Sequence, residues 1–122
     1  MGNFKELNIW KRSKAVAVEV YRITNEGKFA KDFGLKDQIR RSAVSVPSNI
    51  AEGDELDTQK QGIRHFYIAK GSLAELRTQL EISYEIDYLS EELYKKLDVE
   101  CDEIGKMIAS LIKHRSKKID KN

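Results

Sequence analysis

Apolar residues recur every three or four positions along most of the chain, which is the spacing of one face of an α-helix. Four helices are expected, over residues 4–25, 35–53, 58–89 and 90–115. Their core-facing stripes are Ile9, Val16, Val20 and Ile23; Leu35, Ile39, Ala43, Val46 and Ile50; Phe66, Ala69, Leu73, Leu76 and Leu80; and Leu93, Leu97, Cys101, Ile104, Ile108 and Leu111. Four amphipathic helices with short connectors predict an all-α fold, an antiparallel up-down-up-down four-helix bundle. We expect one domain over residues 1–115 and a basic, frayed tail over 116–122.

Local signals indicate where these helices begin and end. Thr58 and Gln61 match a capping box at the start of the third helix, and Ser90 is suited to cap the fourth. Pro47 lies inside the second helix, where it removes a backbone donor and predicts a kink. In the connector before that helix, we expect Phe29 and Phe33 to pack over the end of the bundle.

The second helix carries a polar stripe beside its apolar one. Its members, Gln38, Arg41, Ser45, Asn49 and Glu52, fall within a single arc of the helix. Short, directional polar groups of this kind indicate a face that meets a neighbouring subunit or RNA. Alternatively, they are solvated or satisfy backbone groups that Pro47 leaves without a partner.

A comparable face on the third helix contains Ser72, Glu75 and Gln79. We hypothesise that Glu75 pairs with Arg41; the alternative is that Arg41 is simply solvated. Both helices also carry more apolar residues than one buried stripe requires, which favours a subunit interface. These surplus residues are Val44, Ala51, Ile68, Ile82 and Ile86.

The basic residues give a weaker signal than the stripes. The chain has 22 Lys and Arg against 20 Asp and Glu, a net charge of +2, far from the excess of a dedicated nucleic-acid binder. The candidate nucleic-acid residues are Arg40, Lys60, Arg64, Lys70 and Arg77. Repetition of this surface in an oligomer would strengthen phosphate binding. We expect no base readout, because no aromatic stacking platform stands out.

Motifs for catalysis and for metal or cofactor binding are not apparent. The chain has two histidines, His65 and His114, and neither follows an arginine at the spacing of helical-bundle ribonucleases. Its single cysteine, Cys101, falls on a core stripe and excludes an internal disulfide. We therefore expect no enzymatic activity, no cofactor and no metal. The absence of a signal-like or membrane-spanning apolar run favours a cytoplasmic protein with no membrane partner.

Two segments resemble a known family. They are QIRRSAVSVPSNIAEG at 38–53 and FYIAKGSLAELRTQLEIS at 66–83, and they are similar to the four-helix-bundle proteins encoded in bacterial 23S rRNA intervening sequences. That family is related in fold to accessory proteins of diversity-generating retroelements. The resemblance implies a barrel-like homopentamer associated with RNA. The leading hypothesis is a non-enzymatic oligomer that binds structured RNA or an RNA–protein complex; the alternative is a protein-interaction scaffold that binds no nucleic acid.

Overall fold

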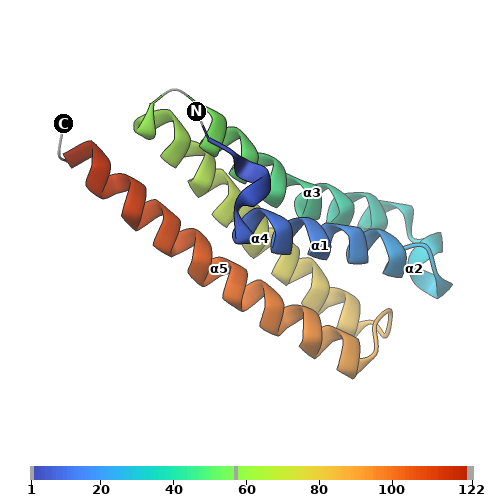
Figure 1. The fold of residues 1–122 in the computed structure, drawn as a ribbon. Helices are drawn as coiled ribbons and strands as arrows, with labels where there is room; N and C mark the ends of the chain where they lie inside the picture. The colour runs from blue at the N-terminus through green and yellow to red at the C-terminus, as the bar shows by residue number, and fades with distance from the viewer. Residues whose placement is uncertain (1, 57, 121–122) are drawn as a thin grey trace.

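The computed structural model describes residues 2–56 and 58–120, and helices joined by short turns make up nearly all of this part of the chain (Figure 1). A 3-10 helix at Phe4–Glu6 precedes five α-helices: α1 Asn8–Ile23, α2 Gly27–Lys31, α3 Phe33–Glu55, α4 Gln59–Glu85 and α5 Glu91–Asp120. The described residues contain no strand. The predicted all-α fold class is confirmed, with α1, α3, α4 and α5 as the long helices.

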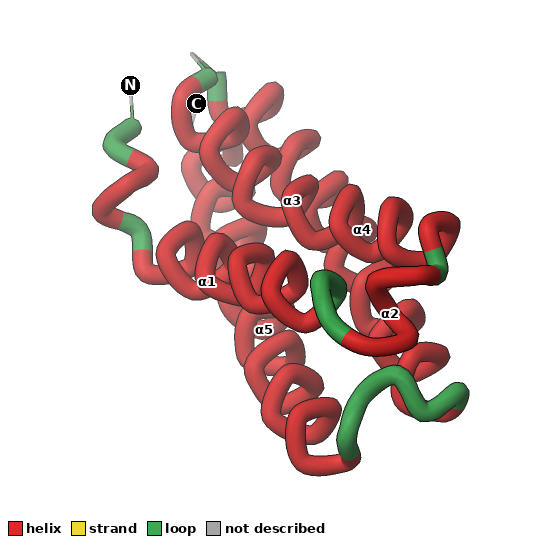
Figure 2. Tube along the Cα trace, turned by 90° about the vertical axis from the view of Figure 1, so that its right-hand side faces the viewer, coloured by secondary structure: helices red, strands yellow, loops and turns green. Residues whose placement is uncertain are grey.

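Neighbouring long helices run in opposite directions. Gly62 near the start of α4 abuts Gly53 near the end of α3, whereas Gln79 far along α4 bonds to Ser42 of α3. In the same way, Arg77 late in α4 pairs with Asp98 early in α5, whereas Phe66 early in α4 lies next to Arg115 late in α5. Figure 1 shows α4 alongside α3 and α5 returning beside α4, and Figure 2 shows α1 running alongside α3 and in front of α5.

The core lies where the predicted apolar stripes meet. Val20, Ile39, Phe66 and Ile108 of the four long helices are each completely buried. Residues at the ends of the stripes, such as Leu35 and Leu111, are only partly buried and pack against this core. The periodicity therefore located the core correctly, because burial follows the helical face on which a residue lies.

The predicted helix caps are present. The Thr58 hydroxyl accepts a hydrogen bond from the Gln61 backbone N–H at 3.2 Å, and the Ser90 hydroxyl accepts one from Leu93 N–H at 3.1 Å. Each bond satisfies a donor that the first turn of a helix leaves free. Asp32 caps α3 in the same way, a cap that was not predicted.

The connector after α1 differs from the prediction in two respects. It contains the short helix α2, and only one of its two phenylalanines packs on the bundle. Phe29 is buried and its ring lies 5.2 Å from that of Tyr88, as expected. The prediction was wrong for Phe33, which is 76% exposed at the first position of α3.

The third predicted helix ends earlier than expected, at Glu85 rather than near residue 89. Asp87 adopts a left-handed conformation with φ of 65°, and the Tyr88 N–H bonds back to Ser83 C=O at 2.8 Å. Together with the bond from Asp87 N–H to Tyr84 C=O, this is a Schellman ending, usually made by glycine. The sequence shows no glycine here, so the stop was missed.

The other two helix predictions concern Pro47 and the tail. Pro47 is buried inside α3, and the helix continues past it to Glu55; the kink stays a prediction. α5 continues through residues 116–120, where we expected fraying, while 121 and 122 lie outside the described residues. Anchoring explains this continuation, because Ile112 is buried in the core and Arg115 forms an ion pair with α3.

Candidate interaction surfaces

Two glycines bring α3 and α4 into close contact. A Cβ atom added to Gly62 would lie 2.5 Å from the Gly53 carbonyl oxygen, closer than real Cβ atoms approach a neighbouring backbone. This approach lets short polar side chains of the two helices reach one another. We call the resulting row the polar seam; it comprises Ser42, Ser45, Asn49 and Glu52 of α3 and His65, Ser72 and Gln79 of α4.

One end of the polar seam is buried, and the contact there is between two uncharged side chains. The Ser42 hydroxyl donates to Gln79 Oε1 at 2.6 Å, and both residues are buried. Buried polar groups need such partners, because an unpaired one keeps the full cost of losing water. Further along, the hydroxyls of Ser45 and Ser72 lie 2.7 Å apart.

Asn49 connects the backbone of α3 to α4. Its Nδ2 donates to the Ser45 carbonyl oxygen at 2.9 Å, one turn earlier on the same helix. The carbonyl that Pro47 leaves without a helical donor is that of Ala43, so the alternative that these side chains replace the missing donor stays a prediction. Its Oδ1 also lies 3.0 Å from Nδ1 of His65. The same side chain thus has a local backbone role and a role between helices.

His65 forms the open end of the polar seam. Its Nδ1 lies 3.0 Å from Oε2 of Glu52 as well as from Asn49, so a proton on Nδ1 is donated toward both oxygens. This role of His65 was not predicted. A usable signal existed: His65, Ser72 and Gln79 are spaced by seven residues, which places them on one face of α4.

The structure divides the predicted polar stripe. Of the eight polar residues predicted on the two helices, five lie in the polar seam: Ser45, Asn49, Glu52, Ser72 and Gln79. The other three, Gln38, Arg41 and Glu75, are exposed outside it. The predicted pair between Arg41 and Glu75 does not form between these described residues. Arg41 instead pairs with Asp37, one turn earlier on the same helix, at 2.8 Å.

An apolar face lies beside the polar seam. It comprises Val44 of α3, Ile68 and Ile82 of α4, and Ile86 directly after α4, each between 40% and 46% exposed. On α4, Ile68 and Ile82 share the helical face of Ser72, because they are separated from it by four and ten residues. Ala51, the fifth surplus residue, is half-buried. Exposed apolar side chains gathered on one face are typical of a contact surface.

The predicted basic residues fall into two groups. Lys60, Arg64 and Lys70 project from α4 and are exposed. Arg77 is half-buried and pairs with Asp98 and Asp102 of α5, at 3.1 and 3.5 Å.

Arg40 also has partners inside the protein. Its guanidinium lies 4.3 Å from the centre of the Tyr21 ring and donates to the Thr24 hydroxyl at 2.8 Å and to Asn25 Oδ1 at 3.0 Å. These contacts join α3 to the end of α1. Arg40 and Arg77 therefore contribute to packing, whereas the three α4 residues are the more available cations.

A buried ion pair lies at the glycine end of the polar seam. Arg115 of α5 contacts Asp54 of α3 at 2.7 Å, and the exposed side-chain fractions are 16% and 5%. The guanidinium also lies 5.4 Å from the centre of the Phe66 ring. Asp54 Oδ2 is buried without a hydrogen-bond partner among the described residues. No sequence pattern indicates this pair, because its members are 61 residues apart.

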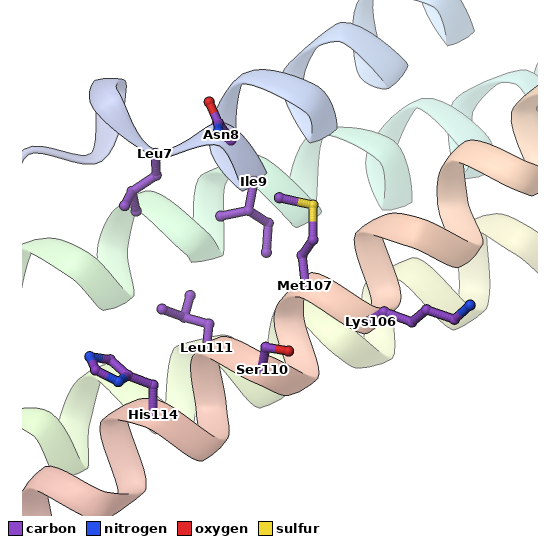
Figure 3. Close-up of a pocket in the computed structure, with 8 residues that line it drawn as sticks. All are labelled: Leu7, Asn8, Ile9, Lys106, Met107, Ser110, Leu111 and His114. Carbon is purple, nitrogen blue, oxygen red and sulfur yellow. The ribbon is translucent and has the colours of Figure 1, made fainter.

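The contact between α1 and α5 is more open. Arg12 bonds there to Glu100 and, at 2.7 Å, to Glu103, and its guanidinium holds the pKa of Glu100 below the ordinary value. Met107, whose sulfur lies 3.6 Å from the Arg12 guanidinium, lines a neighbouring hollow. Figure 3 shows Ile9 and Leu111 facing each other across this hollow.

Catalytic and metal-binding chemistry gains no support from the described residues. No group of three or more His, Cys, Asp and Glu side chains among residues 2–56 and 58–120 is placed to hold a metal ion. Cys101 is completely buried on the core stripe, as predicted, and burial raises the pKa of its thiol to about 12. A thiol this difficult to ionise is a poor nucleophile. None of the helices in the described part of the chain contains an apolar stretch that could span a lipid bilayer.

The long helices pack around one hydrophobic core, which defines an all-helical bundle protein. The polar seam between α3 and α4 is the main set of polar contacts described within it. A model of the family described as 23S rRNA-intervening sequence protein matches residues 5–110. The chain belongs to this family, as the resemblance had indicated.

One solved structure is similar over nearly its full length. It is a protein of unknown function from the S23 ribosomal protein family of Bacteroides thetaiotaomicron, with a TM-score of 0.79 and 27% sequence identity. The match covers 86% of this chain and 98% of that chain. No curated protein matches the chain.

Proposed function

We propose that this protein is a non-enzymatic oligomer that binds structured RNA, or an RNA–protein complex, through a basic surface repeated by self-association. The observation that carries the proposal is the set of exposed cations on α4: Lys60 and Arg64, one turn apart, and Lys70, about a third of a turn around the helix from Arg64. The ion pairs between described residues include neither Arg64 nor Lys70. Their charge is available to phosphates.

Self-association explains how a protein with a small net charge could bind RNA. The apolar face of Val44, Ile68, Ile82 and Ile86 is the proposed contact between copies, and the family resemblance favours a homopentamer. Each added copy repeats the α4 cations, so several weak phosphate contacts act together. Membership of a family described by 23S rRNA intervening sequences supports RNA as the partner.

RNA binding is tested by fluorescence anisotropy with labelled, structured rRNA fragments across a salt titration. We expect micromolar or tighter binding whose log–log salt slope is steep, because bound phosphates release counterions. The Lys60→Ala/Arg64→Ala variant should bind more weakly and lower the slope by about one for each phosphate that is no longer neutralised. The charge-matched control is Lys95→Ala/Lys96→Ala on α5, which should bind as the wild type does. No binding at low salt would contradict the proposal.

Self-association is tested separately by sedimentation equilibrium. An Ile68→Asp/Ile82→Asp variant should dissociate, because both charges would be buried at the proposed contact. A Val99→Asp variant is the control, since Val99 is 62% exposed on another helix and should leave the assembly unchanged. A wild-type monomer at all concentrations would refute the oligomer.

A protein-interaction scaffold is the second candidate. The observation in its favour is the near-neutral net charge of +2, together with the engagement of Arg40 and Arg77 in internal contacts. On this alternative, the apolar face and the polar seam bind another protein. It becomes the favoured function if the assembled protein binds no RNA.

A further inference from the structure

We propose that a groove between α4 and α5 binds an unpaired nucleotide, with its base stacked on the Tyr67 ring and its phosphates held by Lys70, Lys113 and Lys117. We call this site the Tyr67 groove. The inference rests on the proposed RNA binding and adds to it the chemical class of the bound segment. It also assigns a role to Tyr67 and to the lysines near the end of α5.

The Tyr67 groove is a hollow of about 450 Å³ on the outer side of the two helices. Tyr67 lines it and is 56% exposed. The remaining lining residues are Lys70 of α4 and Ala109, Ile112, Lys113, Ser116 and Lys117 of α5. The small side chain of Ala109 and the buried Ile112 leave room beside the ring.

Helix geometry accounts for this convergence. Tyr67 and Lys70 are three residues apart on α4, and Lys113 and Lys117 are four apart on α5, so each pair shares one helical face. The antiparallel packing of α4 and α5 brings the two faces to the same groove. No stacking platform was predicted from the sequence, because the ring and the α5 lysines become neighbours only through this packing.

Charge distinguishes the Tyr67 groove from the next hollow along the same two helices. That neighbouring hollow contains Arg77 and Lys106, but Asp102 lies between them and pairs with both, at 3.5 and 3.2 Å. The described residues that line the Tyr67 groove include three lysines and no carboxylate. Among the residues that the structure describes, no ion pair involves these three lysines, so their positive charge remains without a described counterion in the Tyr67 groove.

The combination of an exposed ring and unneutralised lysines matches a nucleotide better than a simple anion. Free phosphate or an acidic peptide would use the lysines and leave the ring in water. A base stacked on an aromatic side chain, with neighbouring phosphates on lysines, is the usual arrangement for single-stranded nucleic acid. Paired bases in a duplex are already stacked on each other and do not offer a free face.

The test compares a labelled single-stranded RNA of about ten nucleotides with a duplex of the same sequence, by anisotropy on the full-length protein. The Tyr67→Leu variant keeps the apolar bulk and removes the ring. It should bind the single strand roughly 5- to 150-fold more weakly and bind the duplex unchanged. Tyr67→Phe keeps the ring and should bind both as the wild type does. Circular dichroism verifies that the variants fold, as expected at an exposed position.

The lysines are tested on the same two RNAs. Lys113→Ala/Lys117→Ala should weaken single-strand binding and lower its salt slope by about 1.4, since each phosphate on a single strand contributes about 0.7. The control variant Lys95→Ala/Lys96→Ala, at the other end of α5, should change neither the affinity for the single strand nor its salt slope. A short polyglutamate peptide should compete for the single strand far less well than unlabelled RNA does.

The outcomes separate this inference from the proposed function. Unchanged single-strand binding in Tyr67→Leu, with wild-type binding to structured rRNA intact, would overturn the Tyr67 groove and leave RNA binding standing. Equal losses in Tyr67→Phe and Tyr67→Leu would overturn base stacking as the mode of contact. Effective competition by polyglutamate would show an acidic-peptide site instead. Failure of the wild type to bind any RNA would overturn both proposals.

Discussion

Two helix contacts in this bundle are built in opposite ways. Between α3 and α4, Gly53 and Gly62 bring the backbones together, and neutral side chains such as Ser42 and Gln79 bond in the buried part of the interface. Between α1 and α5, by contrast, a half-exposed cluster centred on Arg12 bridges a more open contact.

The difference shows where this protein is rigid. A close backbone approach leaves no space for an added methyl group, so α3 and α4 depend on the shape of a few residues. Exposed ion pairs tolerate substitution and respond to salt and pH, because water screens them. We therefore expect α3 and α4 to be a fixed pair, and the α1–α5 contact to be more easily altered.

The largest effect is expected at the buried ion pair of Arg115 and Asp54, directly after Gly53. Arg115→Met leaves Asp54 with an uncompensated charge at 5% exposure. Breaking a buried pair from one side should lower the free energy of unfolding by about 3 kcal/mol. Urea denaturation at fixed protein concentration measures this, since self-association would shift the apparent stability.

A double variant distinguishes stranded charge from weaker packing. Asp54→Asn/Arg115→Met removes both charges and should be more stable than Arg115→Met alone. Equal stabilities for the single and double variants would mean that the destabilisation comes from removing the Arg115 guanidinium from the Phe66 ring.

The glycine contact is expected to give the next largest effect. Gly62→Ala places a methyl group 2.5 Å from a backbone oxygen that cannot rotate away. Overpacking should exceed the gain in helix propensity and lower the free energy of unfolding by about 2 kcal/mol. Gly71→Ala on the same helix meets nothing within 4 Å and should raise it by about 0.5–1 kcal/mol. Stabilisation by both substitutions would refute the close contact of α3 and α4.

The sequence predicted elements more reliably than the pairing between them. Local rules were sufficient for the Thr58 and Ser90 caps and for the core stripes, because each depends on residues within a few turns of one helix. Which polar groups of two helices meet depends on the register between the helices, and this register cannot be predicted from the pattern of one helix alone. This is why the partner of Gln79 was missed and why Arg41 was wrongly assigned to Glu75 on another helix. The pair that Arg41 does form, with Asp37 four residues earlier on its own helix, follows a local rule and was within reach of the sequence.

Removal of a neutral bond in the polar seam should have a smaller effect than either change at its end. Ser42→Ala leaves Gln79 buried without its 2.6 Å partner. We expect a decrease of about 1–2 kcal/mol in the free energy of unfolding, from the unsatisfied amide oxygen. Ser48→Ala is the control, because Ser48 is exposed on the same helix. Equal, near-zero effects from both would show that the polar seam does not stabilise the pair.

The smallest change in the free energy of unfolding is expected for substitution of Arg12. This change should be recognisable because it depends on pH. The pKa of Glu100 is lowered in the folded protein, chiefly by its hydrogen bond to Arg12. A lowered pKa stabilises the fold above the unfolded value, near 4.5, and this stabilisation is lost as pH falls through the folded value. The Arg12→Gln variant should therefore be less stable than the wild type at neutral pH.

The difference between wild type and Arg12→Gln should then shrink below about pH 4.5, whereas the difference caused by Ser42→Ala should stay constant, because Ser42 and Gln79 do not titrate. Urea midpoints measured from neutral to about pH 3 test both variants in the same buffers. A pH-independent effect of Arg12→Gln would mean that Arg12 acts by packing, for instance against Met107. The α3–α4 and α1–α5 contacts would then differ in how closely the helices approach, but the contribution of each to stability would be equally insensitive to acid.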